Sequence, residues 1–109
     1  MTSSIEDQFR VENLFSLRGK TALVTGGSSG LGLIMSKGLL QNGVKVLIAS
    51  RKAEKSKRAL KELKPHGECY AFNADVTSME DRKALLEEAK EKLGSISILI
   101  NNAGTNWGA

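Results

Sequence analysis

The sequence has 109 residues, of which 40% are hydrophobic, and a formal net charge of +4. This length allows no more than one domain with a modest core. The single cysteine, Cys69, excludes an intramolecular disulfide, and Cys69 with the single histidine, His66, does not make a metal-ligand cluster. No metal site is therefore predicted.

Residues 1–17 are predicted to form an N-terminal extension to a domain that covers residues 18–109. The extension lacks the apolar core of a secretory signal peptide, and its acidic residues are unusual for a mitochondrial transit peptide. No apolar run in the sequence approaches the roughly 20 residues that a membrane-spanning helix needs. The sequence therefore predicts a cytoplasmic protein that does not associate with a membrane.

Four short apolar runs predict β-strands. They cover residues 21–25, 45–49, 69–73 and 96–100. None shows a clean alternation of apolar and polar residues, and this is typical of strands buried on both faces of a parallel sheet.

Three segments between these runs have the apolar spacing of helices. They cover residues 30–42, 53–64 and 79–93. Ser78 followed by Asp81 resembles a capping box at the start of the third helix. The apolar stripes expected to face the sheet are Leu31, Ile34, Met35, Leu39 and Leu40 in the first helix, Ala59, Leu60 and Leu63 in the second, and Leu85, Leu86, Ala89 and Leu93 in the third.

The order βαβαβαβ predicts an α/β, Rossmann-like fold with a parallel sheet. Right-handed crossovers place the first two helices on one face and the third on the other, with the strand order 3-2-1-4. Residues 96–100 then lie at an edge where a fifth strand would pair, so we expect the sheet to be incomplete. Because an exposed apolar edge favours association, the chain alone is expected to be unstable or to self-associate.

Ligands of open parallel sheets bind at the carboxyl ends of the strands. The first predicted strand ends in a glycine-rich stretch, residues 25–32 (TGGSSGLG). Such a turn brings backbone N–H groups, and the positive end of the following helix, close to a pyrophosphate. The stretch matches neither a Walker-type phosphate loop nor a G-x-G-x-x-G fingerprint. By itself it is also compatible with a turn that binds no ligand.

Two motifs together carry a family resemblance. The stretch Thr25-Gly26-x-x-x-Gly30-x-Gly32 and the later Asn101-Asn102-Ala103-Gly104 resemble the N-terminal half of short-chain dehydrogenases/reductases. The lead-in over residues 15–20 and the pair Asp75-Val76 are similar to that family too, so the resemblance covers about residues 15–109. It implies an oxidoreductase that transfers hydride between a nicotinamide cofactor and a small-molecule carbonyl or alcohol.

The resemblance also implies a role for each matching residue. Asp75 would accept a hydrogen bond from the adenine amino group, beside which Val76 would lie; Asp75 could instead be a plain turn or helix-cap residue. Asn101 would be structural. The pyrophosphate turn would be lined by Gly26, Ser28, Gly30, Leu31 and Gly32, and the ribose and nicotinamide side would be bordered by Asn102, Ala103 and Gly104.

The end of the second predicted strand decides the expected cofactor. NAD-selective enzymes usually place a carboxylate there, which bonds the ribose 2′-hydroxyl. Here Ser50 and Arg51 occupy the position, and a hydroxyl with a guanidinium suits a phosphate dianion. Some NADP-linked relatives also carry a basic residue where this chain has Ser29. We therefore predict NADP(H), selected mainly by Arg51 with help from Lys52.

No catalytic residue is predicted. The family uses a serine and a Tyr-x-x-x-Lys pair, and both lie beyond its counterpart of residue 109. The only tyrosine, Tyr70, has Ala74 four residues later and is expected to be a core or strand-surface residue. The chain is therefore expected to be inactive alone, and a truncated, non-catalytic dinucleotide-binding module is the alternative function. The full-length protein is expected to be a homo-oligomer.

Two further readings concern the substrate and a nucleic-acid partner. The tail Trp107-Gly108-Ala109 resembles the rhamnolipid-type 3-oxoacyl-carrier-protein reductases, which would make a 3-oxoacyl thioester the substrate; Trp107 could equally be a packing residue.

Residues 51–64 carry seven Lys and Arg against two Glu. A solvated helix face explains these charges, and without interleaved aromatic residues no nucleic-acid partner is predicted.

Overall fold

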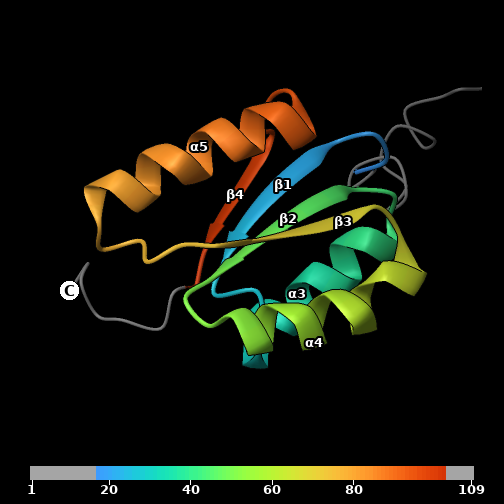
Figure 1. Cartoon of the computed structure of the whole chain (residues 1–109). Helices are drawn as coiled ribbons and strands as arrows, with labels where there is room; N and C mark the ends of the chain where they lie inside the picture. Colours follow the sequence, from blue (N-terminus) through green and yellow to red (C-terminus); the bar gives the residue numbers. More distant parts are fainter. Residues whose placement is uncertain (1–16, 103–109) are drawn as a thin grey trace, which may run out of the picture.

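A computed structural model describes residues 17–102, which form a sheet of four strands with helices on both faces (Figure 1). The strands are β1 (Thr21–Thr25), β2 (Lys45–Ser50), β3 (Cys69–Asn73) and β4 (Ile98–Asn101). The helices are α3 (Gly30–Gln41), α4 (Ala53–Leu63) and α5 (Met79–Leu93), and a short 3-10 turn (Lys64–His66) follows α4. The predicted extension over residues 1–17 lies almost entirely outside the described residues.

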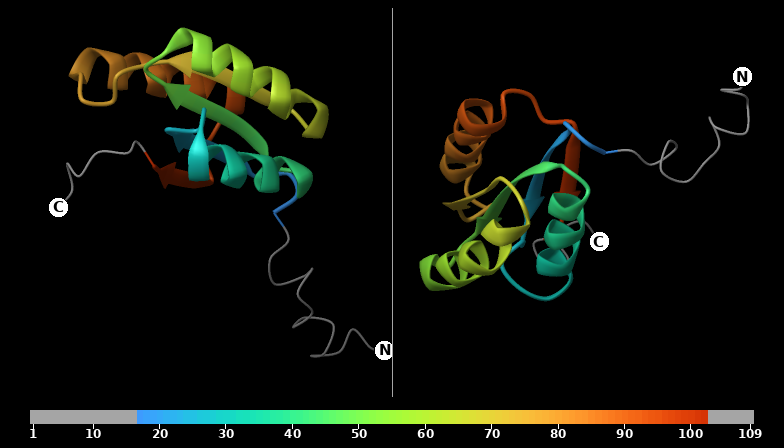
Figure 2. Two further views of the ribbon diagram at one scale, coloured as in Figure 1. Left: turned by 90° about the horizontal axis from the view of Figure 1, so that it is seen from below. Right: turned by 90° about the vertical axis from the view of Figure 1, so that its right-hand side faces the viewer.

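All pairings in the sheet are parallel, and the strand order is β3-β2-β1-β4. Helices α3 and α4 cover one face and α5 covers the other (Figures 1 and 2). This confirms the predicted Rossmann-like α/β fold, its strand order and the side on which each helix lies. Within the described residues β4 pairs only with β1, so it lies at an edge of the sheet as expected.

The element bounds differ from the prediction mainly at β4. The strand begins at Ile98, which pairs with Ala22 of β1, two residues later than predicted. Ser97 lies in the bend before it, and its N–H bonds the Thr21 carbonyl over 3.1 Å. The strand continues through Asn101. Helix α3 ends one residue earlier than predicted, where Asn42 N–H bonds the Leu39 carbonyl three residues back and Gly43 takes a φ of +83°.

The core consists of two apolar clusters, one on each face of the sheet. Ile48 and Val24 point toward α3 and α4, whereas Leu47 and Leu23 point toward α5. Residues Val46 to Ala49 of β2 are each at most 1% exposed. The runs that form β1 and β2 are therefore buried on both faces, as their lack of alternation indicated. The prediction is wrong for β3 and β4, which are only partly buried, with Leu99 of β4 65% exposed.

Helix α3 buries only part of the apolar stripe predicted for it: Leu40 is buried and Leu39 packs against the core, as expected. Leu31 and Ile34 are 60% and 68% exposed, whereas Gly32, Ser36 and Leu40 are buried against the sheet. The buried residues are mostly small, so the helix lies close to the strands, and the Ser36 hydroxyl is satisfied by the Gly32 carbonyl at 2.8 Å. In α5 the stripe is correct except for Leu86, which is 53% exposed. Ala59 and Leu63 of α4 are buried as expected, and Leu60 packs at the edge of the core.

Ser56 in α4 is a buried residue whose hydroxyl group makes no hydrogen bond to the described part of the chain. It is 4% exposed, and its hydroxyl has no hydrogen-bond partner within residues 17–102. Because an unsatisfied buried hydroxyl is destabilising and alanine is the better helix former, we expect Ser56→Ala to raise the free energy of unfolding by about 1 kcal/mol. Urea denaturation followed by circular dichroism measures this change.

Ser36→Ala is the matched control for this substitution. Its hydroxyl is also buried but donates to the Gly32 carbonyl, so its removal should give no gain in stability. A Ser56→Ala protein that is less stable than the wild type would contradict the prediction.

Candidate functional site

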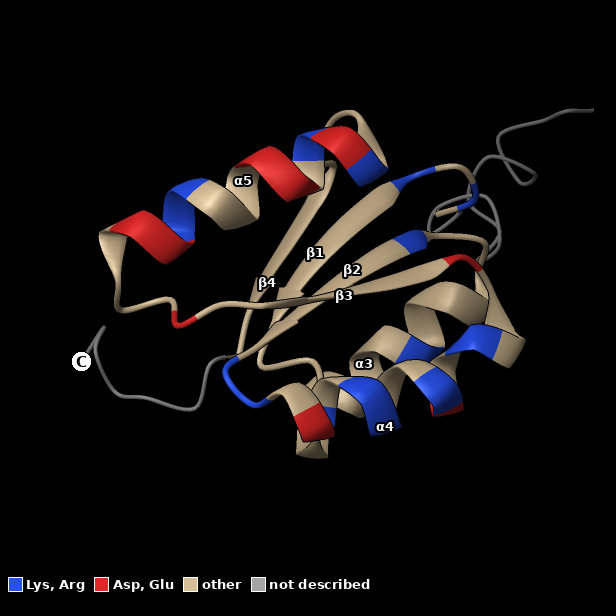
Figure 3. Cartoon of the chain, viewed as in Figure 1, with Lys and Arg blue, Asp and Glu red and all other residues tan. Residues whose placement is uncertain are grey.

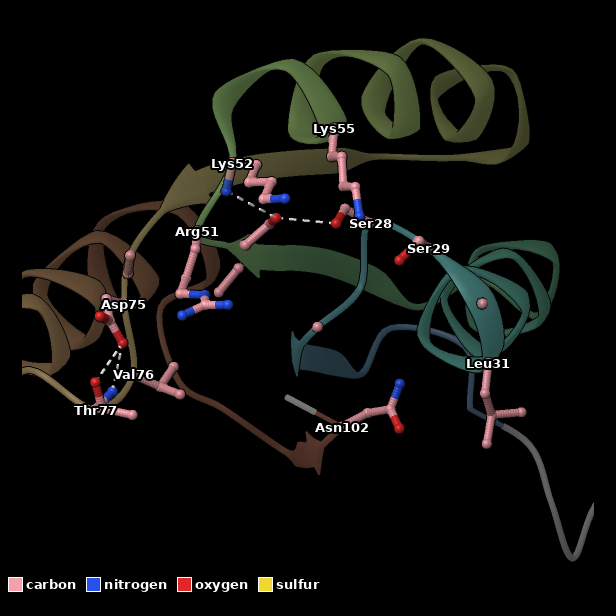
Figure 4. Close-up of a pocket in the computed structure, with 15 residues that line it drawn as sticks. Ser28, Ser29, Leu31, Arg51, Lys52, Lys55, Asp75, Val76, Thr77 and Asn102 are labelled. Carbon is pink, nitrogen blue, oxygen red and sulfur yellow. Dashed lines mark hydrogen bonds between the residues drawn. The ribbon is translucent and has the colours of Figure 1, made fainter. Parts of the chain in front are cut away.

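A cavity of about 410 Å³ opens at the carboxyl ends of β1, β2 and β3 (Figure 4). Eleven of the residues singled out from the sequence line it: Gly26, Ser28, Ser29, Gly30, Leu31, Ser50, Arg51, Lys52, Asp75, Val76 and Asn102. Ala49, Lys55, Ala74 and Thr77 complete the lining. The singled-out residues Ala103 and Gly104 lie outside the described residues. The structure thus brings four separate strand ends to one concave surface.

The glycine-rich stretch forms the tight turn from β1 into α3. Gly26 and Gly30 have φ values of +67° and +56°, which glycine adopts without strain, and Gly26 N–H bonds the Ala49 carbonyl over 2.9 Å. Ser29 precedes α3 and makes no side-chain cap bond, and the first turn of the helix holds no acidic residue. The first N–H groups of α3 are therefore left for an anion in the cavity.

Two further glycines let this turn lie directly on its neighbours. A Cβ atom on Gly32 would lie 2.0 Å from the Gly26 carbonyl oxygen and 2.9 Å from Asn102 Nδ2. A Cβ atom on Gly27 would lie 2.7 Å from Ile48 Cγ2. Gly32 does not itself line the cavity. Because it has no side chain, the turn, the helix and the residue after β4 can lie in direct contact.

Hydroxyl groups and cations meet at the end of β2. The Ser28 hydroxyl donates to Ser50 Oγ over 2.9 Å, and Lys52 N–H donates to the same oxygen over 3.3 Å. We use the term cationic corner for Arg51, Lys52 and Lys55, which all line the cavity near this serine pair. In Figure 4 the Lys52 and Lys55 side chains lie beside the pair, whereas the Arg51 side chain extends away from it. The loop after β2 and the face of α4 carry the basic residues seen in Figure 3. Lys55 was not singled out from the sequence, because the sequence does not show which of the many lysines on a helix faces the cavity.

Among the described residues that line the cavity, Asp75 is the only one with a carboxylate. Its Oδ1 accepts hydrogen bonds from the Thr77 hydroxyl at 2.6 Å and from Thr77 N–H at 2.9 Å. These bonds, and secondarily the nearby charge of Arg51, hold the pKa of Asp75 below its ordinary value. Asp75 is therefore ionised at neutral pH, and it does form the turn that the alternative reading anticipated.

The capping arrangement before α5 differs in one respect from a capping box. The Ser78 hydroxyl accepts from Asp81 N–H at 3.2 Å, as expected. The Asp81 carboxylate, however, accepts from Asp75 N–H at 2.7 Å and not from the N–H of Ser78. This bond fixes the backbone of Asp75 at the rim of the cavity.

The end of β4 is fastened to β1 through Thr25. The Thr25 hydroxyl donates to Asn101 Oδ1 over 3.0 Å and accepts from Asn102 N–H over 3.0 Å. Asn101 thus has the structural contact expected for it, and the Asn102 side chain is directed to the cavity (Figure 4).

The remaining reactive side chains lie away from the cavity. Tyr70 is half-buried on β3 and its hydroxyl donates to the Glu68 carboxylate, so it is a strand-surface residue as predicted. Cys69 is 3% exposed, and burial raises the pKa of its thiol to about 11, which makes it a poor nucleophile. Within residues 17–102 there is no cluster of three His, Cys, Asp or Glu for a metal ion, and no helix is long and apolar enough to cross a bilayer.

Comparison with known proteins gives this geometry a family. The family model described as short chain dehydrogenase matches residues 20–109. The chain belongs to this family. The resemblance seen in the glycine turn and the Asn-Asn-Ala-Gly motif is thereby confirmed, as is the fold that it implied.

Relatives of this short-chain dehydrogenase chain are reductases of several kinds. The rhamnolipids biosynthesis 3-oxoacyl-(acyl-carrier-protein) reductase of Pseudomonas aeruginosa is 43% identical over 95 residues, which are 87% of this chain and 37% of that protein. The RhlG/NADP complex of Pseudomonas aeruginosa matches with a TM-score of 0.78 and 42% identity, over 84% of this chain and 37% of that one. L-Sorbose reductase of Gluconobacter frateurii, solved with NADPH and L-sorbose, has a TM-score of 0.77 and 32% identity, over 81% of this chain and 34% of that one.

Proposed function

We propose that this chain is the cofactor-binding part of an NADP(H)-dependent short-chain oxidoreductase. The observation that carries the proposal is the cationic corner, which lies in the same cavity as the glycine turn. At the end of β2 the chain has Ser50 and Arg51 and no carboxylate. Two solved relatives are described with NADP or NADPH, and they support the same cofactor class.

The residues present fit an NADP molecule part by part. The glycine turn and the first N–H groups of α3 would hold the pyrophosphate, and Gly32 provides the close approach that a side chain would block. Ser50 and Arg51 would hold the ribose 2′-phosphate. Asp75 and Val76 would border the adenine, and Asn102, with Ala103 and Gly104, would border the nicotinamide side.

The reaction we propose is hydride transfer between the nicotinamide and a small-molecule carbonyl or alcohol. The cofactor supplies the hydride when it is bound, and the residues described here bind and orient it. A 3-oxoacyl thioester is the substrate class favoured by the 43% identical relative and by Trp107-Gly108-Ala109, which lie outside the described residues. A cytoplasmic location and homo-oligomeric assembly belong to the same proposal.

Arg51→Asp tests the cofactor assignment. A carboxylate at this position would repel a 2′-phosphate and offer an acceptor to a ribose 2′-hydroxyl. We expect the affinity for NADP⁺ to fall by more than about tenfold and the affinity for NAD⁺ to stay equal or rise. Isothermal titration calorimetry with both cofactors measures the two affinities in the whole protein.

Arg58→Asp is the control, because Arg58 is exposed on α4 and does not line the cavity. The same charge change there should leave the ratio of the two affinities unchanged. If Arg51→Asp also leaves that ratio unchanged, the NADP assignment is wrong.

A further inference from the structure

We propose that Lys55 is a specificity-determining residue that pairs with the 2′-phosphate of NADP(H). This inference rests on the proposed function and assigns part of its cofactor selectivity to helix α4. The sequence alone directed attention to Arg51 and Lys52, which directly follow β2.

The position of Lys55 is the first part of the argument. Lys55 lies in the first turn of α4, four residues after Arg51, and lines the cavity together with Ser28 and Ser50. In Figure 4 its ammonium group is directed toward Ser28, at the bridge between the two serine hydroxyls. Three segments of chain, the glycine turn, the end of β2 and the start of α4, therefore converge on one point.

The distribution of charge is the second part. In Figure 4 the Arg51 side chain extends away from the serine pair, whereas the Lys55 ammonium group lies beside it. Lys55 faces hydroxyl groups, and among residues 17–102 Asp75 is the only one that brings a carboxylate to the lining. The only salt bridge within residues 17–102 joins Lys45 to Glu68, at the starts of β2 and β3, whereas this corner lies at the end of β2. A dianion beside the serine pair would thus interact with the Lys55 ammonium group without competition from a neighbouring carboxylate of the described lining.

The glycine turn itself provides the third part. Its Ser29 brings a hydroxyl and no charge to the cavity, so within the lining the cations come from residues 51–55 alone. A guanidinium binds phosphate oxygens as a planar fork and an ammonium binds them as a compact point charge, so one dianion can contact both. Arg51 supplies the fork, and Lys55 supplies a point charge from the next turn of chain. Selectivity would then come from two elements, the end of β2 and the first turn of α4.

Lys55→Gln, made in the whole protein, tests the proposal. The substitution keeps a long polar side chain and removes the charge at an exposed helix position, so the fold should be unaffected. We expect the affinities for NADP⁺ and for 2′,5′-ADP to fall about tenfold, while those for NAD⁺ and 5′-AMP stay within about twofold. Lys55→Arg, which keeps the charge, should retain most of the selectivity.

Lys57→Gln is the matched control: the same change, two residues along α4, at an exposed position that does not line the cavity. It should leave all four affinities unchanged. Equal losses for NADP⁺ and NAD⁺ in Lys55→Gln, or no loss for either, would overturn the role of Lys55 while leaving the proposed function standing. A wild-type protein that binds neither dinucleotide, or prefers NAD⁺, would instead overturn the proposed function and this inference with it.

Discussion

Gly32→Ala is expected to disrupt both the fold and cofactor binding. The added Cβ would lie 2.0 Å from the Gly26 carbonyl oxygen and 2.8 Å from its carbonyl carbon, and these backbone atoms cannot turn aside as a side chain could. Either α3 or the glycine turn must move. We expect a loss of about 2–4 kcal/mol in the free energy of unfolding and loss of measurable NADP⁺ binding. Urea denaturation and calorimetry measure the two effects.

Gly38→Ala provides a control on the same helix. A Cβ atom at Gly38 would meet no atom within 4 Å, and alanine is the better helix former, so this variant should be as stable as the wild type or slightly more so. If Gly32→Ala and Gly38→Ala are equally stable and bind NADP⁺ equally well, the close packing of the turn on α3 does not have the importance given to it here.

Ile48→Ala is expected to produce a loss of stability of similar size through a different cause. Ile48 is fully buried in β2, in the apolar cluster that joins the sheet to α3 and α4, and it also supports the glycine turn at Gly27. Truncation removes buried methylene and methyl groups and leaves a cavity, which costs about 2–5 kcal/mol. The midpoint of urea denaturation should fall with little change in slope.

Ile34→Ala is the same chemical change at an exposed position. Ile34 is 68% exposed on α3, so its truncation should alter the free energy of unfolding by less than about 0.5 kcal/mol. If the two substitutions are equally destabilising, the assignment of the buried face of α3 is wrong.

The apolar runs and the breaks between them were enough to predict the order of elements. β1 and β3 have the predicted bounds, and α5 does too. These features depend on local preferences: short unbroken apolar runs, a serine at the start of a helix, and a glycine at its end. Because right-handed crossovers are nearly invariant, the expected strand order 3-2-1-4 also predicted the face on which each helix lies.

Hydrophobicity failed as a guide where packing depends on small residues. In α3 the buried face carries Gly32 and Ser36, and the more apolar residues Leu31 and Ile34 are exposed. A periodicity argument weighs side chains by apolar character, whereas the approach of α3 to the sheet depends on having little side chain at the contact. The start of β4 was misplaced because an apolar run does not show which of its residues pair with β1, and this pairing begins at Ile98.

The sequence by itself determined the family, the Rossmann-like order of strands and helices, and the strand ends that carry polar or glycine residues, because each depends on residues that are neighbours in the chain. Only the tertiary structure decided which of those residues share a cavity and what each one contacts. In the tertiary structure the Ser28 hydroxyl is hydrogen-bonded to Ser50, the Asp81 carboxylate is hydrogen-bonded to the backbone N–H of Asp75, and Lys55 lies in the cationic corner. These contacts depend on how the sheet twists and where α4 begins, and no pattern within one segment contains that information.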